Sequence, residues 1–171
     1  MLRRGAMLSL LALAPLASFE SASAQAVQSP QNNFHAAVNG MVSLCPALVR
    51  GGPVPDAVAA APFGFRPITS PAGEHRFESL FHDGIVQVHF EPAAHICTTH
   101  YSGQGFHAVA GVARDMAVEN HFTRILHDDA RPGILGDVFQ RTVANLRARY
   151  IVGEFTASQD ASVAYIERTN P

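Results

Sequence analysis

Apolar residues near the start of the chain recur at helical spacing. Over residues 32–48 they return every three or four positions, as on one face of a helix, and the Gly-Gly-Pro triplet at residues 51–53 ends the run. A second run of the same kind covers residues 106–120, and a shorter helix is predicted for residues 56–61, just before a proline. The sequence therefore predicts two principal helices and a short one.

The centre of the chain has the pattern of three strands. Residues 76–82, 85–91 and 95–101 are rich in β-branched and aromatic residues. Asp-Gly at residues 83–84 is typical of a tight hairpin turn, and Pro-Ala-Ala at residues 92–94 separates the next two strands. In the middle strand apolar and polar residues alternate, so one face is expected to be packed and the other wetter.

In the second half, too, strands are predicted after a helix, and one segment is open to two interpretations. The apolar residues of 138–155 fit an antiparallel strand pair, but they also fit a partly helical segment capped by Asp137. We expect the strand pair. The predicted segments are a strand at 122–127, a polar loop at 128–137, paired strands at 138–143 and 146–155, and a last strand at 162–168.

These elements predict an α+β fold, a mainly antiparallel sheet with the two principal helices packed on one face. A single domain is expected over residues 32–171. An extended stretch that begins at Phe63-Gly64-Phe65 and breaks at residues 70–73 adds a first strand before the three central ones. The halves 32–102 and 103–171 then share the order of one helix followed by four strands, which suggests a degenerate α-β-β-β-β duplication. The layout is similar in outline to that of small secreted inhibitors of the β-lactamase-inhibitor type, although no individual residues carry the resemblance.

The N-terminal residues have the features of a secretory signal peptide. Arg3 and Arg4 precede a short apolar run at residues 6–14, and Ala-Ser-Ala at 22–24 matches a signal-peptidase site. Cleavage there would remove residues 1–24 and leave a flexible leader at 25–31. The adjacent arginines leave twin-arginine export open beside the general secretory route. We therefore expect a periplasmic or secreted protein.

Composition excludes two classes of protein. The chain is 47% hydrophobic and 15% charged with a formal net charge of −2, unlike a disordered tail or a strongly basic nucleic-acid binder. After the signal peptide no segment is long and apolar enough to span a membrane. The remaining expectation is a globular protein with no nucleic-acid partner and no membrane span, whose oligomeric state the sequence leaves open.

The two cysteines are expected to form a disulfide. An even cysteine count in an oxidising compartment favours a bridge, and Cys45 and Cys97 match no zinc or redox spacing. Cys45 lies on the apolar face of the first helix. If Glu91 opposes Ile96 across the second hairpin, Phe90 faces Cys97 on the packed side of the sheet, where a bridge to the helix is feasible.

The same register places four polar residues together on the wetter face: Gln87, His89, Thr98 and His100. Gln87 lies opposite His100, and His89 is the diagonal neighbour of His100 on the adjacent strand. These four residues form the candidate ligand-binding site. The chain has nine histidines and no lysine, so His89 and His100 are also weak candidates for a zinc or copper site that lacks a known third ligand.

Signals for catalysis are weak. Ser-Gly-Gln-Gly at residues 102–105 lacks the preceding glycine of a nucleophile elbow, and H-E-x-x-H is absent. Arg147 and Arg149 alternate on one strand face with Arg141 nearby, where they could attract an anion or pair with acids such as Glu154 and Glu167.

The sequence favours a non-catalytic module that binds a secreted protein or a small ligand on the open sheet face. The alternatives are a histidine-dependent metal-binding protein and a hydrolytic enzyme. No catalytic residue and no cofactor is assigned.

Overall fold

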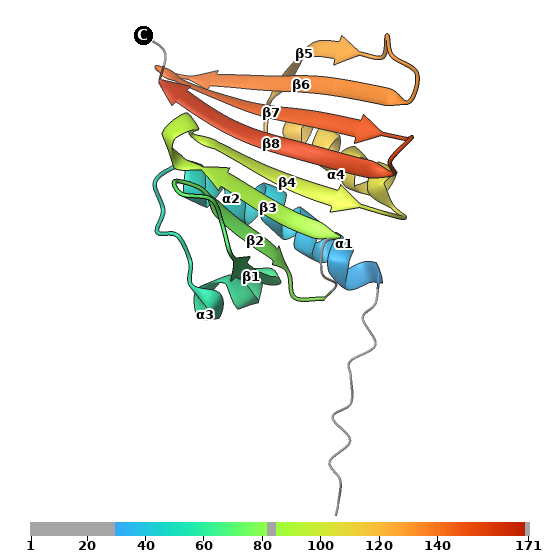
Figure 1. Cartoon of the computed structure of the whole chain (residues 1–171). Helices are drawn as coiled ribbons and strands as arrows, with labels where there is room; N and C mark the ends of the chain where they lie inside the picture. The colour runs from blue at the N-terminus through green and yellow to red at the C-terminus, as the bar shows by residue number, and fades with distance from the viewer. Residues whose placement is uncertain (1–29, 82–84, 170–171) are drawn as a thin grey trace, which may run out of the picture.

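An eight-stranded antiparallel sheet forms the body of the protein (Figure 1). The structure is a computed structural model and describes residues 30–81 and 85–169. The predicted signal peptide, most of the leader and the Asp83-Gly84 turn lie outside these residues. The strands are β1 (Phe65–Ile68), β2 (His75–Ser79), β3 (Val86–Glu91), β4 (Ile96–Ser102), β5 (Thr123–Asp128), β6 (Ile134–Val143), β7 (Leu146–Phe155) and β8 (Asp160–Thr169).

The two halves of the chain each contribute four consecutive strands. The order across the sheet is β1-β2-β3-β4-β8-β7-β6-β5, so β4 and β8 pair at the centre and β1 and β5 form the edges. Each half places its helical segment before its four strands. The predicted α+β class and the repeated element order are therefore confirmed.

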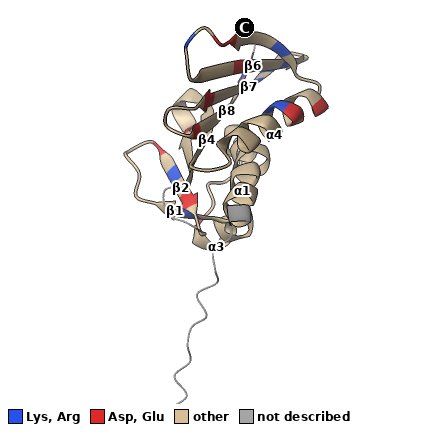
Figure 2. Cartoon of the chain, turned by 90° about the vertical axis from the view of Figure 1, so that its right-hand side faces the viewer, with Lys and Arg blue, Asp and Glu red and all other residues tan. Residues whose placement is uncertain are grey.

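The helices cover one face of the sheet, as Figure 2 shows from the side. The first helical segment runs through α1 (Pro30–Asn39), a π-helical turn (Gly40–Leu44) and α2 (Cys45–Val49) against β3, β4 and β8. Helix α4 (Phe106–Glu119) packs on β7 and β8, while the short α3 (Ala57–Ala60) lies beside β1. None of the helices in the described part of the chain is long and apolar enough to cross a membrane.

The first helical segment lies very close to the sheet at Gly40. A Cβ atom there would come within 2.9 Å of Thr99 Oγ1 and 3.0 Å of Val88 Cγ2, so only glycine fits without a shift of the helix. Next along the helix, Cys45 is fully buried and forms a disulfide with Cys97 of β4. The predicted disulfide is confirmed and joins the helix to the central strands.

Several predicted boundaries were wrong. The loop predicted at 128–137 ends at Ile134, where β6 begins, and Asp137 lies inside that strand as a buried residue rather than at a helix cap. The alternative helical interpretation of 138–155 is therefore wrong as well, and the strand pair is confirmed. Strand β4 starts at Ile96 because His95 is left-handed, with φ of 52°, at the end of the 3-10 turn Pro92–Ala94.

Removal of the disulfide is expected to destabilise the protein strongly. The bridge spans 52 residues, and loss of such a native bridge typically costs about 2–5 kcal/mol. We expect the Cys45→Ala/Cys97→Ala variant to lose stability in this range when unfolding by urea is compared with the wild type. Alkylation of the unreduced, denatured wild type should modify neither cysteine in a mass spectrum; two modified thiols would contradict the bridge.

Candidate functional site

Strand alternation brings the four predicted site residues to the uncovered face of the sheet, hereafter the open face. Gln87 and His89 of β3 alternate with the buried Val86 and Val88, and Gln87 pairs with His100 as predicted. His89 pairs with Thr98 in the same register. All four predicted residues are half-buried.

His89 and His100 form an edge-to-face pair, with ring centroids 5.2 Å apart. Burial lowers the pKa of His89, and the positive charge of Arg76 on the adjacent strand lowers it further. Burial also lowers the pKa of His100, and His89 adds to this effect. Both imidazoles are therefore neutral near pH 7, so each ring offers one N–H donor and one nitrogen acceptor.

A hollow of about 500 Å³ opens beside the two histidines. Three of the four predicted residues line it, whereas Thr98 lies on the same face but outside the lining. The other lining residues come from the end of β4, the β7–β8 hairpin and β8, and sequence reasoning missed them: Ser102, Phe155, Ser158, Asp160 and Ser162.

The missed residues reach the hollow through the pairing of β4 with β8. Ser162 lies opposite His100, and Asp160 lies opposite Ser102. Phe155 forms part of the wall, and its ring occupies the space above Gly153, where a Cβ would lie 3.0 Å from Phe155 Cε2. The hollow thus combines neutral imidazoles, serine hydroxyls and one carboxylate with an aromatic wall.

Within the described part of the chain, the histidine pair has too few neighbouring ligands for a tight metal site. A structural or catalytic zinc ion takes at least three protein ligands. No group of three or more His, Cys, Asp or Glu side chains is placed to hold a metal ion within residues 30–81 and 85–169. Among the residues that the structure describes, the zinc or copper alternative therefore has no third ligand placed beside His89 and His100.

A buried charge network on the helix-covered face was also missed by sequence reasoning. Arg114 of α4 donates from Nε to Asp137 Oδ2 at 2.7 Å and from Nη1 to Glu154 Oε2 at 2.8 Å. His127 Nδ1 lies 2.7 Å from Asp137 Oδ1, and His107 Nδ1 hydrogen-bonds Glu154. The network joins α4 to β5, β6 and β7.

The network keeps both carboxylates ionised. Burial alone would raise the pKa of Asp137, but contacts with His127 and Arg114 outweigh burial and leave that pKa below its ordinary value. The pKa of Glu154 is likewise lowered, because His107 and Arg114 outweigh the effect of burial. Because Arg114 is positively charged and bonded to both, Asp137 and Glu154 stabilise the fold only while their carboxylates are ionised.

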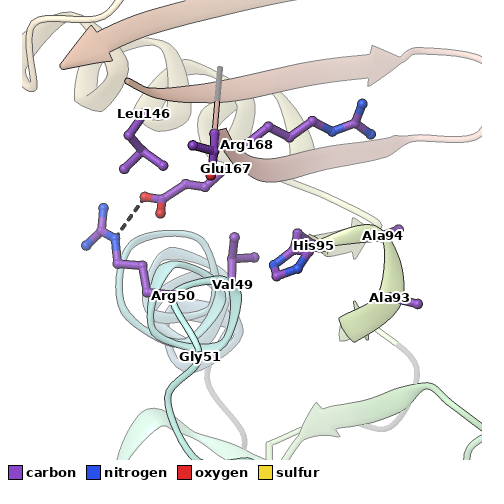
Figure 3. A pocket seen from close by; sticks show the side chains of 10 residues that line it. Val49, Arg50, Gly51, Ala93, Ala94, His95, Leu146, Glu167 and Arg168 are labelled. Carbon is purple, nitrogen blue, oxygen red and sulfur yellow. Dashed lines mark hydrogen bonds and ion pairs between the residues drawn. The ribbon is translucent and has the colours of Figure 1, made fainter. Parts of the chain in front are cut away.

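A second hollow, of about 660 Å³, lies at one end of the sheet between α2, the Pro92–Ala94 turn and the ends of β7 and β8 (Figure 3). Arg50 donates from Nε to Glu167 Oε1 at 2.8 Å and from Nη2 to the Tyr165 hydroxyl at 2.9 Å. Tyr165 in turn hydrogen-bonds Glu167. Because these groups satisfy one another, this hollow has the character of a structural joint between α2 and β8.

Comparison with known protein families, curated proteins and solved structures finds no match for this chain.

The two histidines of the hollow should titrate at unusually low pH. By NMR, we expect the imidazoles of His89 and His100 to titrate below the ordinary value of about 6.5. Since the unfolded chain then takes up these protons first, stability should fall as pH decreases below about 6.5. The His89→Gln/His100→Gln variant should show a shallower fall; an unchanged slope would contradict the assignment.

Replacing the charged Asp137 by a neutral residue should lower the free energy of unfolding. Asp137 is 1% exposed, and removing one partner of a buried ion pair costs about 3–5 kcal/mol, so we expect Asp137→Asn to lose about 3 kcal/mol in urea unfolding at pH 7. Asp129→Asn is the matched control, because Asp129 is 75% exposed and reaches His127 only at 3.7 Å. Its effect should stay within about 0.5 kcal/mol.

The same network predicts acid sensitivity with a definite sign. Because the folded pKa of Asp137 and of Glu154 is lowered, their stabilisation is complete above the unfolded pKa of about 4 and is lost as pH falls through the folded value. Asp137→Asn should therefore flatten this acid-side loss of stability. Equal pH profiles for the variant and the wild type would contradict the role of the network.

Proposed function

We propose that this protein is a non-catalytic binding module whose open sheet face takes up a secreted protein or a small ligand. The observation that carries the proposal is the hollow beside His89 and His100, which lies on the one broad face of the sheet that no described helix covers. Surface concavities lined by a few polar groups and an apolar wall are typical of binding sites.

The groups in the hollow suit a partner that both donates and accepts hydrogen bonds. Gln87, the two neutral histidines and the serine hydroxyls each offer donors and acceptors, whereas Asp160 only accepts when ionised. Phe155 adds an apolar wall against which the partner can pack. A peptide backbone or the hydroxyl-rich part of a small molecule has this complementary chemistry.

The apolar centre of the open face supports a broad contact. Beside the hollow, the open face carries half-buried aliphatic side chains from β4, β6, β7 and β8, which are Ile96, Val138, Ile151, Ala164 and Ile166. An apolar centre with a polar margin is the usual anatomy of a protein interface.

A hydrolase is the second candidate, because His127 is oriented by Asp137 through its Nδ1 atom as a general base would be. Its Nε2 atom, however, faces the carboxylate of Asp129 at 3.7 Å and not a hydroxyl or thiol nucleophile. The contact with Asp129 favours a charge-network role for His127.

The proposed location is the periplasm or the extracellular space. A disulfide and the absence of a membrane-spanning helix among the described residues are compatible with such a location. The N-terminal signal-peptide pattern is the further support for it.

Site-specific photo-crosslinking in secreting cells tests which face binds. A photo-reactive residue at Thr98, on the open face, should form a defined adduct with the partner. The matched position is Val118, 62% exposed on α4, which should give none. Adducts at Val118 and none at Thr98 would overturn the proposal.

With the adduct identified, the hollow itself can be tested. We expect His89→Ala/His100→Ala to weaken binding of that partner by about tenfold or more, as removal of central contact residues does. His35→Ala serves as control, since His35 is an exposed histidine on α1. Equal affinities for wild type and the double variant would remove the hollow from the binding site.

A further inference from the structure

Three arginines gather at the end of the open face where β7 begins and β8 ends. Arg147 of β7 lies directly opposite Arg168 of β8, and Arg149 follows two residues along β7. Strand alternation places all three on the same face as Ile151 and Ile166. This arginine cluster lies at the opposite end of β8 from Asp160 of the hollow.

The cluster has no acidic partner among the described residues. Arg149 donates to the neutral Gln140 at 2.8 Å, and neither Arg147 nor Arg168 forms an ion pair or a side-chain hydrogen bond. Glu167, next in sequence to Arg168, points to the other face, where Arg50 holds it. Like charges directly opposite in an antiparallel pair are destabilising, and an external anion would relieve that repulsion.

Exposed apolar residues close the hairpin beside the cluster. Val143 and Leu146 pair at the end of β6 and β7, and their side chains are 60% and 39% exposed. Leu146 immediately precedes Arg147, but alternation turns it to the opposite face. A surface that meets the end of the sheet would contact both the apolar pair and the arginines.

We propose that this end of the sheet docks on an anionic lipid surface. Anionic headgroups supply negative charge over a plane, and the acyl region beneath accepts Val143 and Leu146. A free anion would satisfy the arginines and leave the apolar pair in water. Since the whole chain carries a formal net charge of −2, attraction to such a surface has to come from this local cluster.

This docking site goes beyond the proposed function and is separate from the hollow beside His89 and His100, while Leu146 and Arg168 also line the second hollow. With the end of the sheet on the membrane, the strands point away from the surface and the rest of the open face remains accessible. Loss of lipid binding and loss of partner binding are therefore expected from different variants.

Vesicle co-sedimentation of the purified protein tests the electrostatic part. At low salt the protein should bind vesicles of phosphatidylcholine and phosphatidylglycerol at 7:3 and not vesicles of phosphatidylcholine alone. Each arginine near an anionic surface contributes about a fivefold gain in binding, so Arg147→Gln/Arg168→Gln should bind about thirtyfold more weakly. Arg66→Gln/Arg131→Gln changes the net charge equally at other sites and should bind as the wild type does.

Tryptophan fluorescence tests the apolar part, because the chain contains no tryptophan. In Leu146→Trp, emission should shift to the blue when anionic vesicles are added. In Val118→Trp, at an exposed position of α4, it should remain unchanged.

Three results would overturn the proposal. The first is no binding of the wild type to anionic vesicles at low salt, and the second is an equal loss in the two arginine double variants. The third is complete competition by millimolar inorganic phosphate without any shift of Leu146→Trp, which would indicate a site for a free anion instead of a lipid surface.

Discussion

The register between β4 and β8 is the constraint on which the rest of the structure depends. This pair joins the two four-stranded halves into one sheet. Its register determines which side chains of β4 and β8 lie together on the face that the helices cover. Cys97 lies opposite Tyr165 on the helix-covered face, whereas His100 lies opposite Ser162 on the open face. A slip of one residue in this pair would turn the side chains of β8 over relative to those of β4, so that Ser162 would leave the hollow and Tyr165 would leave the helix-covered face.

One disulfide and several charged contacts hold the helices on the covered face and leave the other face of the sheet uncovered. The disulfide holds the first helical segment against β4, and Arg50 ties its end to Tyr165 and Glu167. In the second half, Arg114 ties α4 to β6 and β7 through two ionised carboxylates. Because both helical segments are attached on the same side, the open face does not need to contribute to holding them and can carry polar groups such as His89 and His100.

Local sequence patterns predicted much of the fold and the first part of the site. Alternation along β3 and the short connection to β4 were enough to place Gln87 opposite His100, because register in a hairpin is set locally. The pairing of β4 with β8 joins residues about 60 positions apart, and no local pattern reports it, so Asp160 and Ser162 were missed. Asp137 was assigned to a loop because a charged residue is not expected inside a buried strand. In the folded chain its charge is compensated by Arg114, a partner that no local pattern reveals.

Solvent paramagnetic relaxation of methyl groups in the free protein tests the central claim most directly. That claim is that one face of the sheet is covered and the other is available in solution. With a soluble paramagnetic probe, we predict strong relaxation at Ile151 and Ile166 on the open face and protection at the buried Val152 and Val163. Equal protection of all four residues would show that another layer covers the open face and would contradict the account.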